Sequence, residues 1–178
     1  VVVVGPGLLG RASTGELLER LLPRIEQARV VLDAVALSAL GEHRHLAGSL
    51  EGRLVLTPNS GELAALRGDD DDDLPLPALA ERYGAVVSTG GEVVTPDGRR
   101  WVDEAGGIGL GTSGSGDVLA GVVGGLLARG CTPEQAAVWG QYVHAGAGDR
   151  LAGQLGRTGF LARELLDELV PVLSGLNA

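Results

Sequence analysis

The chain has 178 residues, a net charge of −9 and an apolar fraction of 44%, most of it aliphatic, so we expect one domain built around an aliphatic core. The acidic balance and an aromatic content of 3% argue against a polyanion-binding or base-stacking surface, and the single cysteine, Cys131, excludes an internal disulfide. No apolar run reaches the roughly 20 residues that span a bilayer and no basic segment precedes the first strand as in a secretory signal, so we expect a cytoplasmic protein without nucleic-acid or membrane partners.

In the first half of the chain, short aliphatic runs alternate with helix-periodic segments. Buried parallel strands are predicted at 1–4, 29–32 and 53–56. Thr14 has the character of an N-cap for a helix that reaches Ile25, and Pro23 should bend or restart that helix. Further helices are expected at 34–40, where Gly41 is a C-cap candidate, and at 62–67 and 76–82. The five aspartates at 69–73 predict a solvated surface loop.

In the second half, a hairpin is followed by helices. Short strands are predicted at 85–87, 92–95 and 99–102, with a turn at Pro96-Asp97-Gly98. Helices are expected at 118–129, from Pro133 to about residue 151, and at 160–173. Strands that alternate with helices predict a doubly wound α/β domain with a mainly parallel sheet.

Polar residues follow the second and third predicted strands. Asp33 stands at the carboxyl end of the second strand, where ligands bind in open parallel sheets, or it caps the helix that follows. After the third strand, Asn59 and Glu62 lie three residues apart across a helix start. They can bind a ligand or a metal-bound water, with Glu62 as the metal residue, or they can belong to a capping arrangement around Ser60.

The segment 111–121 is a Gly-rich loop that opens a helix. Glycines allow the backbone to approach a ligand closely, and the first turn of a helix offers unpaired N–H groups, so this segment predicts a phosphate site. Asp117 would then act as general base toward an attacking hydroxyl or hold magnesium in its second sphere. The alternative is that Ser115 or Asp117 only caps the helix.

Two further groups have plain structural alternatives. The backbone of Thr89-Gly90-Gly91 can offer N–H groups to phosphate, although an ordinary turn explains the same residues. His144 lies on an Ala/Gly-rich helix face, which favours a packing role over a catalytic one. We expect the polar clusters at 5–10, 57–62 and 111–117 to converge on one edge of the sheet.

Motifs along nearly the whole chain carry a family resemblance. They are Val4-Gly5-Pro6-Gly7-Leu8, Val31-Leu32-Asp33-Ala34, the segments 56–62 and 112–121, and His144-Ala145-Gly146-Ala147-Gly148-Asp149. Their residues and order resemble the ribokinase-like superfamily, and within it the ADP- or ATP-dependent NAD(P)H-hydrate dehydratases. The resemblance implies a three-layer sandwich over residues 1–178 that lacks the family's N-terminal part.

The same resemblance implies an enzyme that phosphorylates the hydroxyl of hydrated NADH or NADPH with ADP or ATP and magnesium, and then eliminates phosphate. Asp117 would be the catalytic base. The implied substrate-binding residues are Gly7, Asp33, Asn59 and Asp117, and the implied nucleotide-binding residues are Thr89, Gly90, Gly91, Gly114, Ser115 and Gly116. A homo-oligomer is expected.

The chain departs from the family pattern at specific positions. Thr89 stands where the family has lysine, Asn59 where it has histidine, and Val35 where it has a second aspartate; the chain contains no lysine at all. Asn59 with Glu62 instead matches the Asn-x-x-Glu element of vitamin kinases in the superfamily. A small-molecule kinase and a non-catalytic nucleotide-binding domain are therefore the alternatives.

Overall fold

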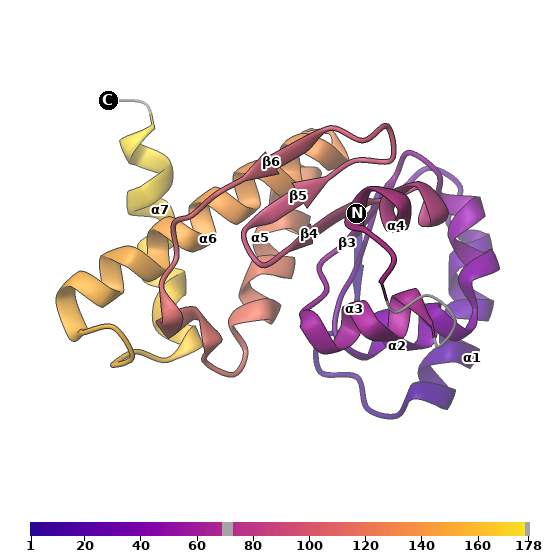
Figure 1. Ribbon diagram of the computed structural model, residues 1–178, viewed down its shortest axis with the longest axis horizontal. Helices are drawn as coiled ribbons and strands as arrows, with labels where there is room; N and C mark the ends of the chain where they lie inside the picture. The colour runs from indigo at the N-terminus through magenta and orange to yellow at the C-terminus, as the bar shows by residue number, and fades with distance from the viewer. Residues whose placement is uncertain (69–72, 177–178) are drawn as a thin grey trace.

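The computed structural model describes residues 1–68 and 73–176, which form one six-stranded sheet with helices on both faces (Figure 1). The strands lie in the order β1-β2-β3-β4-β5-β6. Their bounds are β1 Val2–Val4, β2 Val30–Leu32, β3 Leu54–Leu56, β4 Val86–Thr89, β5 Glu92–Val94 and β6 Arg100–Val102. The first four pair in parallel and the last two add an antiparallel hairpin, which confirms the mainly parallel α/β sheet.

One face of the sheet is covered by the crossover helices of the amino-terminal half, which Figure 1 shows gathered on one side. They are α1 Arg11–Leu21, α2 Val35–Glu42, α3 Ser60–Arg67 and α4 Leu76–Tyr83. Neighbouring parallel strands joined by right-handed crossovers place every connecting helix on the same face. Because strand side chains alternate between faces, Val30 and Leu32 point into this core while Val31 points into the other.

The opposite face carries the helices that follow the hairpin: α5 Ser115–Ala128 and α6 Pro133–Leu155, with α7 Leu165–Gly175 packed on α6. Val31, Val55 and Val86 pack against α5 and α6. The strands β2, β3 and β4 are buried along their whole length, so their continuous aliphatic sequence reflects burial on both faces. No helix in the described part of the chain is long and apolar enough to cross a membrane.

Several predicted boundaries differ from the structure. Helix α1 begins at Arg11, because Gly10 is the N-cap residue and the Thr14 hydroxyl bonds back to the Gly10 carbonyl inside the first turn. Gly41 lies within α2, which continues to Glu42, so it is not the C-cap; a 3₁₀ segment, Arg44–Leu50, follows. Pro23 does end α1, within a 3₁₀ turn. The predicted aspartate loop falls mostly on residues 69–72, outside the described residues.

We predict that Gly5→Ala lowers the free energy of unfolding by more than about 3 kcal/mol. Gly5 has φ of +130°, and a Cβ there would lie 1.7 Å from the Asp33 carbonyl oxygen, so backbone would have to move. Gly7→Ala is the matched control: φ is +75° but a Cβ would meet nothing within 4 Å, and only about 1–2 kcal/mol of backbone strain is expected. Urea denaturation measures both; equal losses would contradict the explanation.

Candidate active site

The carboxyl ends of neighbouring parallel strands deliver polar residues to one edge of the sheet. The ladder continues one residue beyond the strands, with the Asp33 N–H donating to the Val4 carbonyl at 3.0 Å and the Thr57 N–H to the Leu32 carbonyl at 3.2 Å. Two cavities open at this edge, a smaller one of about 340 Å³ and a larger one of about 520 Å³. They share the lining residues Thr57, Asn59, Leu110 and Gly116.

Asp33 lies on the wall of the smaller cavity and is buried, with only 3% of the residue exposed. Its Oδ1 accepts a hydrogen bond of 2.9 Å from the Thr57 hydroxyl. Burial raises the pKa of Asp33 to about 6; the Thr57 hydrogen bond opposes that rise, and the charges of Glu62 and Asp117 add to it. Asp33 does not cap α2, whose N-cap residue is Ala34 without a side-chain cap bond.

Ala34 is the one non-glycine residue of the described chain with positive φ, at 51°. It also lines the smaller cavity, directly after Asp33. Such a conformation is unfavourable for a residue with a Cβ and is retained where the surroundings fix it. The strained backbone therefore belongs to the same wall as the buried carboxylate.

Asn59 and Glu62 form a capping box at the start of α3. The Asn59 Oδ1 accepts from the Glu62 N–H at 3.0 Å, and the Glu62 Oε2 accepts from the Asn59 N–H at 2.9 Å. The capping alternative is thus observed, with Asn59 rather than Ser60 as the cap. Both side chains still line the smaller cavity, and in the described chain the Asn59 amide nitrogen and the Glu62 Oε1 have no hydrogen-bond partner there.

Helix α5 begins three residues earlier than the predicted Val118. Gly114 is its N-cap in the left-handed conformation, with φ of 88°, so Ser115, Gly116 and Asp117 form the first turn. No side chain caps this helix, and the N–H groups of Gly116 and Asp117 have no acceptor within the described residues. Gly116 borders both cavities, so the predicted anion site is a free helix N-terminus with an exposed carboxylate, Asp117, beside it.

Ser115 is buried and held by His144 of α6. The His144 Nε2 lies 2.9 Å from the Ser115 Oγ and 3.0 Å from the Ser115 carbonyl oxygen. A carbonyl only accepts, so Nε2 carries the proton, and burial lowers the pKa of His144, which keeps the ring neutral. The Ser115 hydroxyl hydrogen then remains available to an anion. Sequence reasoning expected a packing histidine and did not find this contact, which depends on the pairing of two helices.

Thr89, Gly90 and Gly91 close the hairpin between β4 and β5 and also line the larger cavity. Both glycines have positive φ, 54° and 84°, as a two-residue hairpin turn requires. These residues therefore form the ordinary turn that was the alternative, and they also line the candidate site. The larger cavity also contains residues that sequence reasoning missed, among them Ser88, Gln141 and the segment 103–106, which come from a strand, a helix and a loop far apart in sequence.

The first polar cluster, residues 5–10, reaches the site only through Gly5, which lies against the Asp33 carbonyl. Gly7 lines neither cavity. Two of the three expected clusters, 57–62 and 111–117, thus meet at the cavities, together with Asp33.

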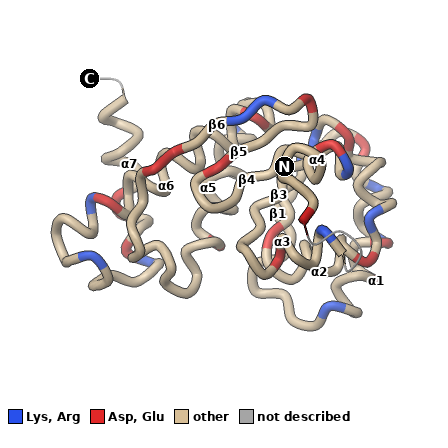
Figure 2. Tube along the Cα trace, viewed as in Figure 1, with Lys and Arg blue, Asp and Glu red and all other residues tan. Residues whose placement is uncertain are grey.

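Acidic side chains dominate the electrostatics of the site. The described residues lining the two cavities include Asp33, Glu62, Asp103, Glu104 and Asp117, and no arginine. Figure 2 shows the acidic start of the 103–107 loop directly after β6. Within the described chain, no three His, Cys, Asp or Glu residues are grouped to hold a metal ion. Glu62 and Asp117 therefore fit a magnesium ion only if phosphate oxygens complete its coordination.

A family model for NAD(P)H-hydrate dehydratase matches residues 1–171. An ADP-dependent (S)-NAD(P)H-hydrate dehydratase of Xanthomonas campestris is 45% identical over 98% of this chain and 61% of its own length. A bifunctional NAD(P)H-hydrate repair enzyme of Moorella thermoacetica is 40% identical over 99% of this chain and 35% of its own. The chain therefore spans less than two thirds of these relatives.

Solved structures show the same fold. An ADP/ATP-dependent NAD(P)H-hydrate dehydratase from Bacillus subtilis, co-crystallised with ATP and Mg²⁺, superposes with a TM-score of 0.75 at 24% identity, covering 97% of this chain and 63% of that one. Ribokinase from Thermotoga maritima gives 0.56 at 22% identity, covering 94% and 55%. These likenesses confirm the ribokinase-like architecture.

We predict that Asp33→Asn raises the free energy of unfolding at pH 8 by about 3 kcal/mol, since each of the roughly two pKa units by which Asp33 is raised corresponds to about 1.4 kcal/mol. The folded pKa of Asp33, about 6, exceeds the ordinary 3.8, so the folded state binds more protons between these values. Asp33 should therefore make stability fall as pH rises from about 4 to about 6. Urea denaturation at pH 4, 6 and 8 measures this, with Asp167→Asn on the exposed face of α7 as control; an unchanged pH slope in Asp33→Asn would refute it.

Proposed function

The chain belongs to the NAD(P)H-hydrate dehydratase family, and we propose that it restores NADH or NADPH from the hydrated form at the expense of ADP or ATP, with Mg²⁺. The observation that carries this proposal is the first turn of α5. There the unpaired N–H groups of Gly116 and Asp117 and the exposed Asp117 carboxylate stand together where two cavities meet. A phosphoryl group and the hydroxyl that attacks it need such a junction.

We assign the larger cavity to the adenine nucleotide. Its phosphates would approach the α5 N-terminus, where Gly114 permits the turn and the Ser115 hydroxyl and Gly116 N–H donate hydrogen bonds. The turn Thr89-Gly90-Gly91 lines the same cavity and would bind the nucleotide from the sheet side.

We assign the smaller cavity to the hydrated ring. The Asn59 amide and the buried Asp33 line it and would orient the ring. Gly7, two residues after Gly5 in the first loop, lines neither cavity and is proposed as a substrate residue only on the family resemblance. Asp117 lines this cavity from the side of the phosphate site. A hydroxyl placed between Asp117 and the terminal phosphate would meet both a base and an electrophile.

The reaction then has two steps. The oxygen of the ring hydroxyl attacks the terminal phosphorus while Asp117 takes the proton of that hydroxyl. AMP or ADP leaves with the bridging oxygen. Phosphate then departs with the electrons of the carbon–oxygen bond, and loss of a proton from the adjacent ring carbon restores the double bond. The α5 N–H groups stabilise charge on the transferring phosphoryl group, where positioning and electrostatics contribute most.

The acidic lining gives divalent cations a defined role. No arginine lines either cavity among the described residues, and His144 is held neutral, so the nucleotide's charge must be balanced by backbone N–H groups and by Mg²⁺. When bound, Mg²⁺ would neutralise phosphate oxygens. Glu62, with an oxygen left over from the capping box, is the proposed ligand.

A small-molecule kinase is the second candidate. The pair Asn59 and Glu62 has the spacing of the vitamin-kinase element, and the same α5 N-terminus and base would serve phosphoryl transfer to another hydroxyl. The phosphate-elimination step distinguishes the two functions, because a dehydratase releases inorganic phosphate whereas a kinase would release a stable phosphate ester.

We predict that the protein, given hydrated NADH, Mg²⁺ and ADP or ATP, restores the absorbance of the reduced nicotinamide, and that Asp117→Asn lowers turnover at least about 100-fold. Nucleotide affinity should change little, because the asparagine keeps the size of the side chain and the α5 N–H groups remain. Asp167→Asn is the control. Absence of recovery by the wild type would refute the dehydratase, and a stable phosphate ester would favour the kinase.

We predict that Thr89→Lys tightens binding of Mg-ATP by about 5- to 10-fold, near the 1 kcal/mol that one partly solvated charge pair contributes. Thr89 ends β4 on the wall of the larger cavity, in a site without a cationic side chain among its described lining residues. Thr89→Gln is the matched control, with a long but uncharged side chain. Isothermal titration at two salt concentrations measures the effect, and equal affinities of the Lys and Gln variants would exclude it.

A further inference from the structure

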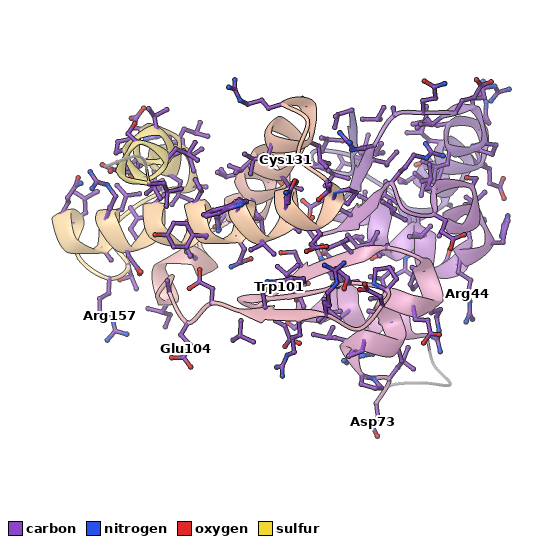
Figure 3. All side chains as sticks on the ribbon, turned by 90° about the horizontal axis from the view of Figure 1, so that it is seen from above. Arg44, Asp73, Trp101, Glu104, Cys131 and Arg157 are labelled. Carbon is purple, nitrogen blue, oxygen red and sulfur yellow. The ribbon has the colours of Figure 1, made fainter. Side chains whose placement is uncertain are left out.

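The loop 103–107 forms one wall of the larger cavity. Asp103, Glu104, Ala105 and Gly106 all line it, together with Thr57 and Asn59 from the β3–α3 loop. Glu104 points away from the molecule into solvent (Figure 3). The loop contains no regular secondary structure, so contacts with other elements must hold this wall in place.

At its first end, the loop is anchored to the β4–β5 turn. The Asp103 N–H donates to the Gly91 carbonyl at 2.8 Å, and the Asp103 Oδ1 accepts from the Ala105 N–H at 2.9 Å. The first bond continues the hairpin ladder, the second lies within the loop, and neither reaches beyond Ala105.

At its other end, the loop is held by Asp149 of α6. The Gly106 N–H lies 3.2 Å from both carboxylate oxygens of Asp149, and the Gly107 N–H lies 3.3 Å from the Oδ1. Two successive backbone donors converge on one anion, the arrangement that binds carboxylates in backbone nests. In the described chain, Asp149 makes no ion pair that would otherwise occupy it.

Small residues allow this loop to lie directly on α6. Gly106 has φ of +84°, and a Cβ there would be 3.1 Å from the Ala145 Cβ. A Cβ at Gly148 would be 2.7 Å from Leu110, one of the residues that border both cavities. The wall and the helix are therefore in contact over one turn of α6, and Asp149 supplies the polar contact of that turn.

The same helix fixes the other walls. Gln141 lies 3.4 Å from the Ser88 hydroxyl of β4, and His144 holds Ser115 at the start of α5. Spacings of three or four residues place side chains on one face of a helix, so Gln141, His144 and Gly148 lie on the same face of α6, with Asp149 beside them. Gln141 and His144 are buried, whereas Asp149 is exposed and bonds only to the loop backbone, so the Asp149 contact orders the loop rather than the core.

We propose that Asp149 is a positioning residue for the nucleotide, which sets the width of the larger cavity by holding the Gly106 and Gly107 N–H groups and thus the loop 103–107. The inference rests on the proposed function only in assigning that cavity to the nucleotide. Asp149 lines neither cavity, so it touches neither ligand. Its loss should weaken nucleotide binding and leave the chemical step unchanged.

The test compares Asp149→Ala, Asp149→Asn and the control Asp167→Asn. Isothermal titration with Mg-ADP and Mg-ATP measures Kd, and steady-state assays with hydrated NADH give kcat and the two KM values. We expect Asp149→Ala to raise the nucleotide Kd and KM about 10-fold, the scale of one hydrogen bond to a charged group. Asp149→Asn keeps one acceptor oxygen and should raise them about 3-fold. The value of kcat should stay within about 2-fold and the KM for hydrated NADH should not change.

Hydrogen exchange distinguishes positioning from general stability. Amides of residues 105–107 should exchange faster in Asp149→Ala, while protection in β2 and β3 stays as in the wild type. An unchanged nucleotide Kd, or a fall in kcat at unchanged Kd, would overturn the proposal. If the alanine variant does not fold, the same criteria apply to Asp149→Asn. Nucleotide binding without recovery of NADH would refute the dehydratase alone, since the Kd comparison does not need turnover.

Discussion

The parallel register of β1, β2 and β3 is the constraint on which the site depends. The hydrogen bonds from Asp33 to Val4 and from Thr57 to Leu32 extend the ladder to the residues at which each strand ends. Because the three strands end level, Asp33 and Thr57 become neighbours and their side chains bond to each other. Gly5 has to be a glycine because the chain turns directly over the Asp33 carbonyl. A shift of register by one residue would reverse the faces and separate these groups.

The other half of the site is set by helix packing. Helix α6 lies against β4 and α5, and its residues Gln141 and His144 reach Ser88 and Ser115. These polar contacts are buried and specific, so they fix where the first turn of α5 stands relative to the sheet. The exposed Asp117 and the free N–H groups beside it thus occupy a fixed place without being stabilised by a cap of their own. The helix start is available to a ligand because a neighbouring helix, not a capping side chain, positions it.

Strand ends and glycine loops were predictable from the sequence because they are local. The burial of 29–32 and 53–56 and the Gly-rich segment 111–117 led to Asp33, Asn59 and Asp117, which the structure brings to adjoining cavities. The start of α5 was placed three residues late, since apolar periodicity marks the buried face of a helix and not its first turn. His144, Gln141 and Asp149 were missed as contributors to the site because their partners lie on other elements, and spacing along α6 does not reveal them.

The two cavities share Thr57, Asn59, Leu110 and Gly116, and their described charged side chains are all carboxylates. Each occupant therefore changes the electrostatic potential that the other meets. A cation that arrives with the first ligand lowers the repulsion for a second anionic ligand, which gives the two binding events a favourable coupling free energy. Such coupling is reciprocal, so either ligand increases the affinity for the other by the same factor. The acidic lining thereby links the two binding events through the protein's charge distribution, whichever ligand binds first.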